Sequence, residues 1–236
     1  MTEAIRPGQH PRELEVFDHG FVRLDAVMAD DLSVVNSARV SFAARSDEMD
    51  QRNRGLVRFL MRQRHGTPFE HNSLRFHIRT PIFVAREWFR HRMGSFNEES
   101  ARYHKLSDDF YVPERDAIRT QVGKPGAYTF EPVDDELATE TIAIFKDTYE
   151  ELYRKYDDLV EKGVAKEVAR ALLPFGIYTQ FYWTLNARSL MNFLSLRNSP
   201  EAQYEIRVYA EAIERLWSET MPVTHESFVE FGRRAP

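Results

Sequence analysis

The order of strand-like and helix-like segments is the feature that most constrains how this chain folds. Alternating apolar and polar residues at positions 73–79 and 179–186 indicate half-buried strands. Helical spacing of apolar residues dominates elsewhere, above all over residues 134–162. Because the strands do not alternate regularly with the helices, the pattern favours an α+β fold over a doubly wound sheet. We predict one helix-rich domain over residues 1–236, with a small mixed or antiparallel sheet.

Turn and capping residues locate two further elements. A β-hairpin is expected over residues 14–28, with its turn at Asp18-His19-Gly20. Thr80 and Pro81 are typical of a helix start, as N-cap and first helical residue, and Gly94 is typical of that helix's end. The sequence therefore predicts a helix directly after the strand that ends at residue 79.

The remaining stretches are interpreted from composition and periodicity. Residues 1–13 are expected to form a flexible tail, and residues 95–103 an irregular polar segment. Prolines and glycines between residues 113 and 133 predict a long variable loop. The other expected helices cover residues 30–40, 50–64, 134–162, 165–173 and 187–197, with Asn186 as an N-cap, and a last long helix begins at Ser199.

The absence of cysteine excludes whole classes of chemistry. Disulfides, zinc–thiolate sites, iron–sulfur clusters and cysteine nucleophiles are all impossible in this chain. Its 32 basic residues face 37 acidic ones, and the net charge of −5 argues against bulk nucleic acid as the main partner. The basic residues are mostly arginine, which suits phosphate and carboxylate ligands, although a biased genome composition gives the same excess.

No membrane or secretion signal is expected. The polar residues 1–11 lack an apolar targeting core, and no apolar run approaches the length of a membrane span. We therefore expect a cytoplasmic protein without a membrane partner.

The densest group of reactive side chains is the string R-H-R-M-G-S-F-N-E-E-S-A-R-Y at residues 90–103. Arg86 and Arg90 share a helix face, and Ser100 and Arg102 can point the same way from an extended loop. For any one of these residues, pairing between Arg and Glu around a helix end is an adequate explanation. The whole string instead favours a site for a phosphate and a polar heterocycle.

Two other groups carry polar side chains in unusual settings. His65, His71 and His77 are six residues apart, which matches no helical or strand ligand geometry, so no metal site is expected. Arg188 and Asn192 are adjacent on one face of an otherwise apolar helix, and their partners are either internal groups or a ligand. The glycines form neither a dinucleotide fingerprint nor a P-loop, so any dinucleotide must be held by other means.

The string at residues 90–103 fits R-H-R-x-x-S-x-N-E-x-S-x-R-Y at every specified position. In this it resembles the flavin-dependent thymidylate synthases, and the similarity extends over nearly the whole chain outside the N-terminal tail and residues 113–133. The resemblance implies a homotetramer of α+β subunits with FAD as cofactor. It also implies that dUMP is converted to dTMP, with 5,10-methylenetetrahydrofolate as carbon donor and NADPH as reductant.

The resemblance further implies roles for individual residues, among them Glu87, where relatives often carry Gln. The residues implied to lie beside the flavin are Ser41, His65, Thr67, Glu70, Arg90, His91, Arg92, Glu98, Asn186, Arg188 and Asn192. Those implied to surround dUMP are Glu87, Arg90, Glu98, Ser100, Arg102, Arg170 and Arg197.

The chemistry of such a reaction agrees with the composition. C5 of uracil is a poor nucleophile, and a chain without cysteine cannot activate it by adding a thiolate to C6. Activation must then be electrostatic, and a guanidinium near the N3–O4 edge would push electron density toward C5. We assign that catalytic role to Arg197, and we expect Ser100 only to position the nucleotide.

Two other function classes compete with this interpretation. One is an RNA-binding module that uses the arginines of residues 52–64 and 90–102; the acidic balance counts against it, and a purified protein without flavin colour would revive it. The other is a metal-dependent nucleotide hydrolase that uses the histidines, which inhibition by chelators would support.

Overall fold

The computed structural model describes residues 12–124 and 127–236. The chain divides into two compact units. Unit 1 consists of Met1–Thr80, Val84–Glu98 and Gln180–Pro236, and unit 2 of Pro81–Phe83 and Glu99–Thr179. The expectation of a single domain over residues 1–236 stays a prediction.

A five-stranded sheet forms the centre of unit 1, and two of its strands continue into unit 2 at their ends. The pairs β1–β2, β2–β3 and β4–β7 are antiparallel, and β2 carries an irregularity between Leu24 and Ala26. This confirms the α+β class and the antiparallel character of the sheet. In sheet order the strands are β1 (Glu13–Val16), β2 (Gly20–Met28), β3 (Ser73–Pro81), β7 (Tyr178–Leu185) and β4 (Ser95–Glu98).

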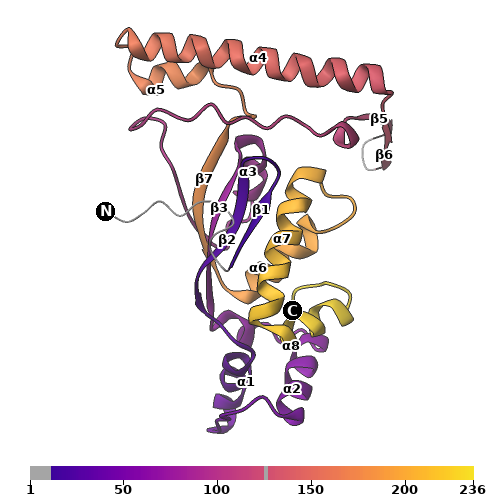
Figure 1. The fold of residues 1–236 in the computed structure, drawn as a ribbon. Coiled ribbons are helices and arrows are strands. Elements are labelled where there is room, and N and C mark those ends of the chain that lie inside the picture. The colour runs from indigo at the N-terminus through magenta and orange to yellow at the C-terminus, as the bar shows by residue number, and fades with distance from the viewer. Residues whose placement is uncertain (1–11, 125–126) are drawn as a thin grey trace. The chain divides into compact units, whose positions relative to one another are not determined.

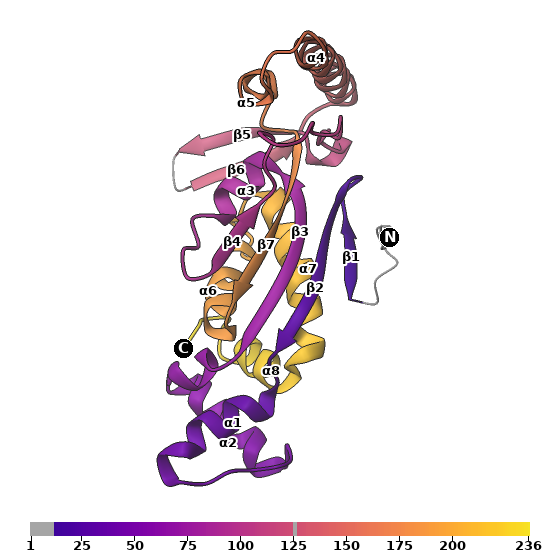
Figure 2. The same cartoon turned by 90° about the vertical axis from the view of Figure 1, so that its left-hand side faces the viewer.

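Helices cover one face of this sheet. Within unit 1, α6 (Ala187–Arg197) and α7 (Tyr204–Thr220) lie side by side on it, as Figure 2 shows. The core between the layers is aromatic: Trp88 stacks on Phe193 at 5.1 Å and meets Trp183 edge-on at 5.5 Å, measured between ring centroids. Such large buried rings fix the helices on the sheet through area and geometry together.

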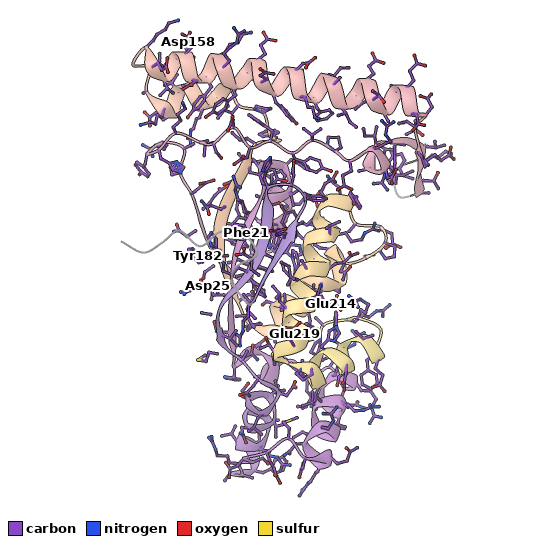
Figure 3. All side chains as sticks on the ribbon, in the orientation of Figure 1. Phe21, Asp25, Asp158, Tyr182, Glu214 and Glu219 are labelled. Carbon is purple, nitrogen blue, oxygen red and sulfur yellow. The ribbon has the colours of Figure 1, made fainter. Side chains whose placement is uncertain are left out.

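The other face of the sheet carries mixed polar and aromatic side chains. Figure 3 labels Phe21, Asp25 and Tyr182 on this side, away from α6 and α7. Arg75 pairs with Asp25 at 2.7 Å and lies over the Tyr182 ring at 5.5 Å. The alternation of residues 73–79 therefore separates a buried face from this exposed one, as the sequence predicts.

Three more helices of unit 1 pack together below the sheet in Figure 1. The carboxylate of Asp31 accepts from the backbone N–H groups of Val223 and Thr224 at 2.9 and 2.8 Å, which caps the start of the last helix. These helices are α1 (Asp31–Arg39), α2 (Gln51–Arg62) and α8 (Pro222–Glu230). The short turn η1 (Val40–Phe42) follows α1, and η2 (Thr67–Glu70) lies between α2 and β3.

Unit 2 contains the longest helix of the described residues. This helix, α4 (Asp135–Glu161), is capped by the carboxylate of Asp134, which accepts from the Leu137 N–H at 2.8 Å. The short helix α5 (Lys166–Ala169) lies beside the C-terminal part of α4 (Figure 1). The elements are η3 (Arg115–Ala117), β5 (Arg119–Lys124), β6 (Ala127–Pro132), α4 (Asp135–Glu161), α5 (Lys166–Ala169) and η4 (Arg170–Leu172).

Most expected elements are confirmed. They are the hairpin of residues 14–28, the strands at 73–79 and 179–186, the helices near 30–40, 50–64, 134–162 and 187–197, and helical turns within 165–173. Asn186 caps α6 as predicted, because its side-chain oxygen accepts from the Ser189 N–H at 2.9 Å. Of the expected tail of residues 1–13, most lies outside the described residues, but Glu13 is wrongly included, since it belongs to β1 and pairs with Arg23 at 2.5 Å.

The helix after β3 differs from the prediction at both ends. The strand continues through Pro81 and α3 (Ile82–Trp88) begins at Ile82, so Thr80 is not its N-cap. Instead the Ile82 N–H donates to the carbonyl of Ile177 at 2.9 Å, a partner that only the tertiary fold supplies. The helix stops at Trp88 rather than Gly94, and a turn follows in which the His91 N–H donates to the Trp88 carbonyl at 2.9 Å.

Two stretches expected to be irregular form strands. Residues 95–98 pair with β7, and Phe96 is held there by Trp183, at 5.9 Å between ring centroids. The expected loop at 113–133 contains the β5–β6 hairpin; residues 125–126 lie outside the described residues. Neither segment carries a local sign of strand pairing: residues 95–98 have only one large apolar residue, and residues 113–133 contain prolines and glycines typical of a loop.

The expected last helix is wrong in its start at Ser199. Residues 199–203 form a turn, with the Ala202 N–H donating to the Ser199 carbonyl at 3.0 Å, and α7 begins at Tyr204. A second break at Met221 separates α8, whose start is satisfied by the distant Asp31. The second break is held by Asp31, which is far away in the sequence, so periodicity alone does not show it.

Candidate active site

A hollow in unit 1 lies between α1, η1, α2 and η2. Its volume is about 1190 Å³, which is of the size used for small ligands and cofactors. Ser41, His65 and Thr67, three of the residues expected beside the flavin, line it. Phe42, at 85% exposure, and Phe59 add apolar surface. Its arginines are Arg39, Arg52 and Arg64.

A second hollow of about 490 Å³ lies at the start of α6. It brings together four more residues expected beside the flavin, which are Glu70, Asn186, Arg188 and Asn192. The guanidinium of Arg188 pairs with Glu70 at 2.5 Å and donates through Nε to the carbonyl of Pro236 at 2.7 Å. Arg188 thus has internal partners, as one of the two interpretations of the sequence allowed.

Gly66 lines the first hollow and lies next to Arg188, which lines the second; sequence reasoning noted it only as a helix stop. A Cβ at Gly66 would lie 2.6 Å from Nε of Arg188 and 3.0 Å from the Pro236 carbonyl. No side chain fits there without moving the guanidinium. The glycine thus lets the Arg188 guanidinium pack against the backbone beside the hollows. The arginines, the hydroxyls of Ser41 and Thr67 and the apolar rings that line the hollows are groups suited to an anionic nucleotide with a planar ring, so the residues present fit a flavin nucleotide.

The third group surrounds the end of α6. Arg197 donates through Nε to Nε2 of His91 at 3.0 Å, and its NH1 lies 3.3 Å from the carboxylate of Glu87. The Arg197 side chain is 24% exposed, so it is not fully enclosed by the protein. This arrangement brings Arg197 to two residues, Glu87 and His91, that lie 110 and 106 positions before it in the sequence.

Burial governs the ionisation of this group. Burial, together with the charge of Arg197, lowers the pKa of His91 to about 4, so its imidazole is neutral at neutral pH and can accept the Arg197 hydrogen bond. Burial also raises the pKa of Glu87, against the opposing charge of Arg197 and with a smaller contribution from Glu205. The result is a fixed positive charge held by one neutral base and one carboxylate.

The remaining residues of the string are distributed over both units. Arg90, Arg92 and Glu98 belong to unit 1, where all three are exposed and Glu98 ends β4. Ser100, Arg102 and Arg170 belong to unit 2. Arg102 pairs there with Glu167 at 3.0 Å, with both side chains 53% exposed, so this guanidinium is accessible to an anion.

The structure bears on the two competing interpretations. Two arginines of α2 pair with glutamates of α8, Arg54 with Glu226 at 3.0 Å and Arg58 with Glu230 at 2.5 Å, as expected of a solvated charged face. The histidines have separate surroundings: His65 lines the hollow between α1 and α2, and His77 stacks on Tyr182 at 4.6 Å. Within residues 12–124 and 127–236, no three side chains of metal-binding type gather. Nor does that part of the chain hold a helix long and apolar enough to cross a membrane.

Comparison with known proteins assigns the chain to a family. The model of the family described as "Thymidylate synthase complementing protein" matches residues 23–223. The "Flavin-dependent thymidylate synthase" of Thermosipho melanesiensis is 46% identical over 222 residues, which cover 94% of this chain and 96% of that protein. The protein of the same name from Streptomyces coelicolor is 42% identical over 243 residues, with 98% of each covered.

A solved structure is similar over the same extent. The UMP/dUMP methylase PolB from Streptomyces cacaoi, bound with 5-Br dUMP, superimposes with a TM-score of 0.86 at 43% identity, over 94% of this chain and 100% of that one. Fold and site together thus define a methyltransferase with arginine-lined hollows. More narrowly, the chain belongs to the family of flavin-dependent thymidylate synthases.

Proposed function

We propose that this enzyme reductively methylates dUMP to dTMP, with 5,10-methylenetetrahydrofolate as carbon donor and NADPH as reductant. PolB, bound with 5-Br dUMP in one structure and with 5-Br UMP in another, supports a pyrimidine nucleotide as substrate. The observation that carries the proposal is the Arg197 guanidinium, oriented by His91 and Glu87 in a chain without cysteine. We place the reaction in the cytoplasm.

The chain's own residues then act by charge and orientation. The neutral imidazole of His91 fixes the Arg197 plane without cancelling its charge, and Glu87 holds one terminal nitrogen. A guanidinium so fixed next to the N3–O4 edge of uracil stabilises negative charge on the ring and makes C5 more nucleophilic. Arg102 and Arg170 are the proposed phosphate contacts, and Arg90, Glu98 and Ser100 complete the nucleotide site.

The flavin is proposed to lie along the two hollows of unit 1. When bound, FAD supplies two-electron reduction with electrons from NADPH. Its proposed contacts are Ser41, His65, Thr67, Glu70, Arg90, His91, Arg92, Glu98, Asn186, Arg188 and Asn192. These lie on separate segments rather than on one glycine-rich turn, which supports a site completed between subunits of a homotetramer.

An absorbance spectrum of the purified protein tests the proposal most directly. We expect the bands of oxidised flavin, bleached by NADPH, followed by dTMP formation when dUMP and methylenetetrahydrofolate are added. A colourless protein that neither binds added FAD nor forms dTMP would overturn it. Flavin affinity should also rise with protein concentration, and a monomer that retains stoichiometric FAD would contradict assembly of the site between subunits.

A further inference from the structure

A buried carboxylate outside the described site connects to it in two directions. Glu214 lies on α7 close to where that helix meets α8 (Figure 3), and it is 8% exposed. Its carboxylate accepts from Asn198 Nδ2 at 2.6 Å, from His225 Nε2 at 2.9 Å, and from the guanidinium of Arg233. These donors come from the end of α6, from α8 and from the segment that follows α8.

The charge of this group is fixed by its partners. Burial alone would raise the pKa of Glu214, but the hydrogen bonds from His225, Arg233 and Asn198, and the Arg233 charge, outweigh it and lower the pKa to about 2. An ionised carboxylate at this depth is costly unless every donor stays in place. The network therefore resists displacement of any of the three donors.

The first direction leads to Arg197. Asn198 is the C-cap of α6, directly after Arg197, and its N–H donates to the Leu194 carbonyl at 3.0 Å. Holding the Asn198 side chain fixes the last turn of the helix, from which Arg197 reaches His91 and Glu87. Of these contacts, only the one to Glu214 anchors the turn to α7.

The second direction leads to Arg188. Arg233 has a positive φ of 55°, and its N–H donates to the Phe228 carbonyl at 2.8 Å, so the chain reverses there. Three residues later, Pro236 lies in the wall of the second hollow and accepts the Arg188 Nε hydrogen bond. The contact between Glu214 and Arg233 thus anchors the segment that orients Arg188.

We propose that Glu214 is a positioning residue that aligns two arginines of the site at once, Arg197 through Asn198 and Arg188 through Arg233. The roles of Arg197 and Arg188 toward nucleotide and flavin rest on the proposed function, whereas the alignment rests on the hydrogen bonds alone. A displacement of about 1 Å at a reacting group can cost up to about 10²-fold in rate. Glu214 is therefore expected to influence catalysis without touching any ligand.

The two directions can be separated by single substitutions. Asn198→Ala cuts the path to Arg197, and we expect kcat for dTMP formation to fall about 10-fold or more with flavin affinity retained. Arg233→Ala cuts the path to Arg188, and flavin affinity should fall while flavin-saturated kcat changes little. Glu214→Ala should show both losses, and Glu214→Gln, which keeps one acceptor oxygen, should be intermediate.

Asp31→Asn is the matched control. Asp31 is also a buried carboxylate with three donors, including the Thr224 Oγ1 at 2.6 Å, and it holds the same helix α8. At a comparable fall in Tm it should leave flavin affinity and kcat unchanged. Equal effects of Asp31→Asn and Glu214→Ala, or no split between Asn198→Ala and Arg233→Ala, would overturn the inference.

Amide hydrogen exchange of the protein without added ligand gives a readout that does not depend on the proposed reaction. Glu214→Ala should accelerate exchange at residues 197–199 and 233–235, whereas Asp31→Asn should not. Unchanged exchange at both segments would contradict the alignment even if the enzyme methylates dUMP. Accelerated exchange in a protein that forms no dTMP would instead refute only the proposed function.

Discussion

Acid should weaken the fold through Glu214, and the size of the effect follows from its pKa. The pKa is about 2 in the folded chain against 4.5 for an unperturbed glutamate. Each pKa unit corresponds to about 1.4 kcal/mol, so the ionised carboxylate contributes about 3 kcal/mol to the free energy of unfolding. Because the folded pKa is depressed, this contribution is present above pH 4.5 and is lost as the pH falls toward 2.

The variant Glu214→Gln isolates this contribution. In this variant an NH2 group replaces the oxygen that accepts from Asn198 and Arg233, so donors face donors. The variant should therefore be less stable than the wild type at neutral pH. Its stability should then lack the Glu214 part of the acid dependence. Neutral His91, with a pKa lowered to about 4, also loses stability as the pH falls from 6.5, but it does so equally in both proteins.

The measurement is urea unfolding, followed by circular dichroism, at intervals between pH 7 and pH 2. We expect the difference in unfolding free energy between wild type and Glu214→Gln to shrink by about 3 kcal/mol over the acid part of this range. Glu226→Gln, which removes an exposed ion pair with Arg54, serves as a control and should follow the wild-type curve. Parallel curves for wild type and Glu214→Gln would refute the reasoning.

Other predictions concern the site itself. Arg197→Ala should keep its flavin and its reduction by NADPH, while kcat for methylation falls by about 10²–10³; a raised KM for dUMP with unchanged kcat would make Arg197 only an anchor. Arg102→Ala should raise the KM for dUMP with little change in kcat, since a phosphate contact serves ground and transition states alike, and steady-state kinetics will check this. Gly66→Ala should weaken FAD binding in a fluorescence titration, because its Cβ would lie 2.6 Å from Arg188 Nε; unchanged affinity would show that the close approach has no role.

Some limits of sequence reasoning are visible at single residues. The cap of α6 by Asn186 was predictable because donor and acceptor are three residues apart. The cap of α8 by Asp31 was not, because its partners are 192 and 193 residues away. The same holds for the start of α3, where the Ile177 carbonyl replaces the expected Thr80 cap.

In the candidate site, too, features of local sequence were predictable and contacts between distant residues were not. The sequence alone indicated the string at residues 90–103, the pair of Arg188 and Asn192, and the importance of lacking cysteine, since these are facts of residue type and spacing. It gave no sign that Gly66 packs on Arg188, because a glycine's lack of a side chain matters only once a neighbour is known.

What the sequence determined by itself is therefore the α+β class, the main strands and helices, and the family signature, all of which are written in local periodicity and motif. Only the tertiary structure decided that β4 pairs with β7, that Arg197 meets His91 and Glu87, and that Glu214 collects donors from three elements. The physical reason is that burial and hydrogen bonding join groups through space. Their partners, and the pKa values that result, are set by distances that residue order does not contain.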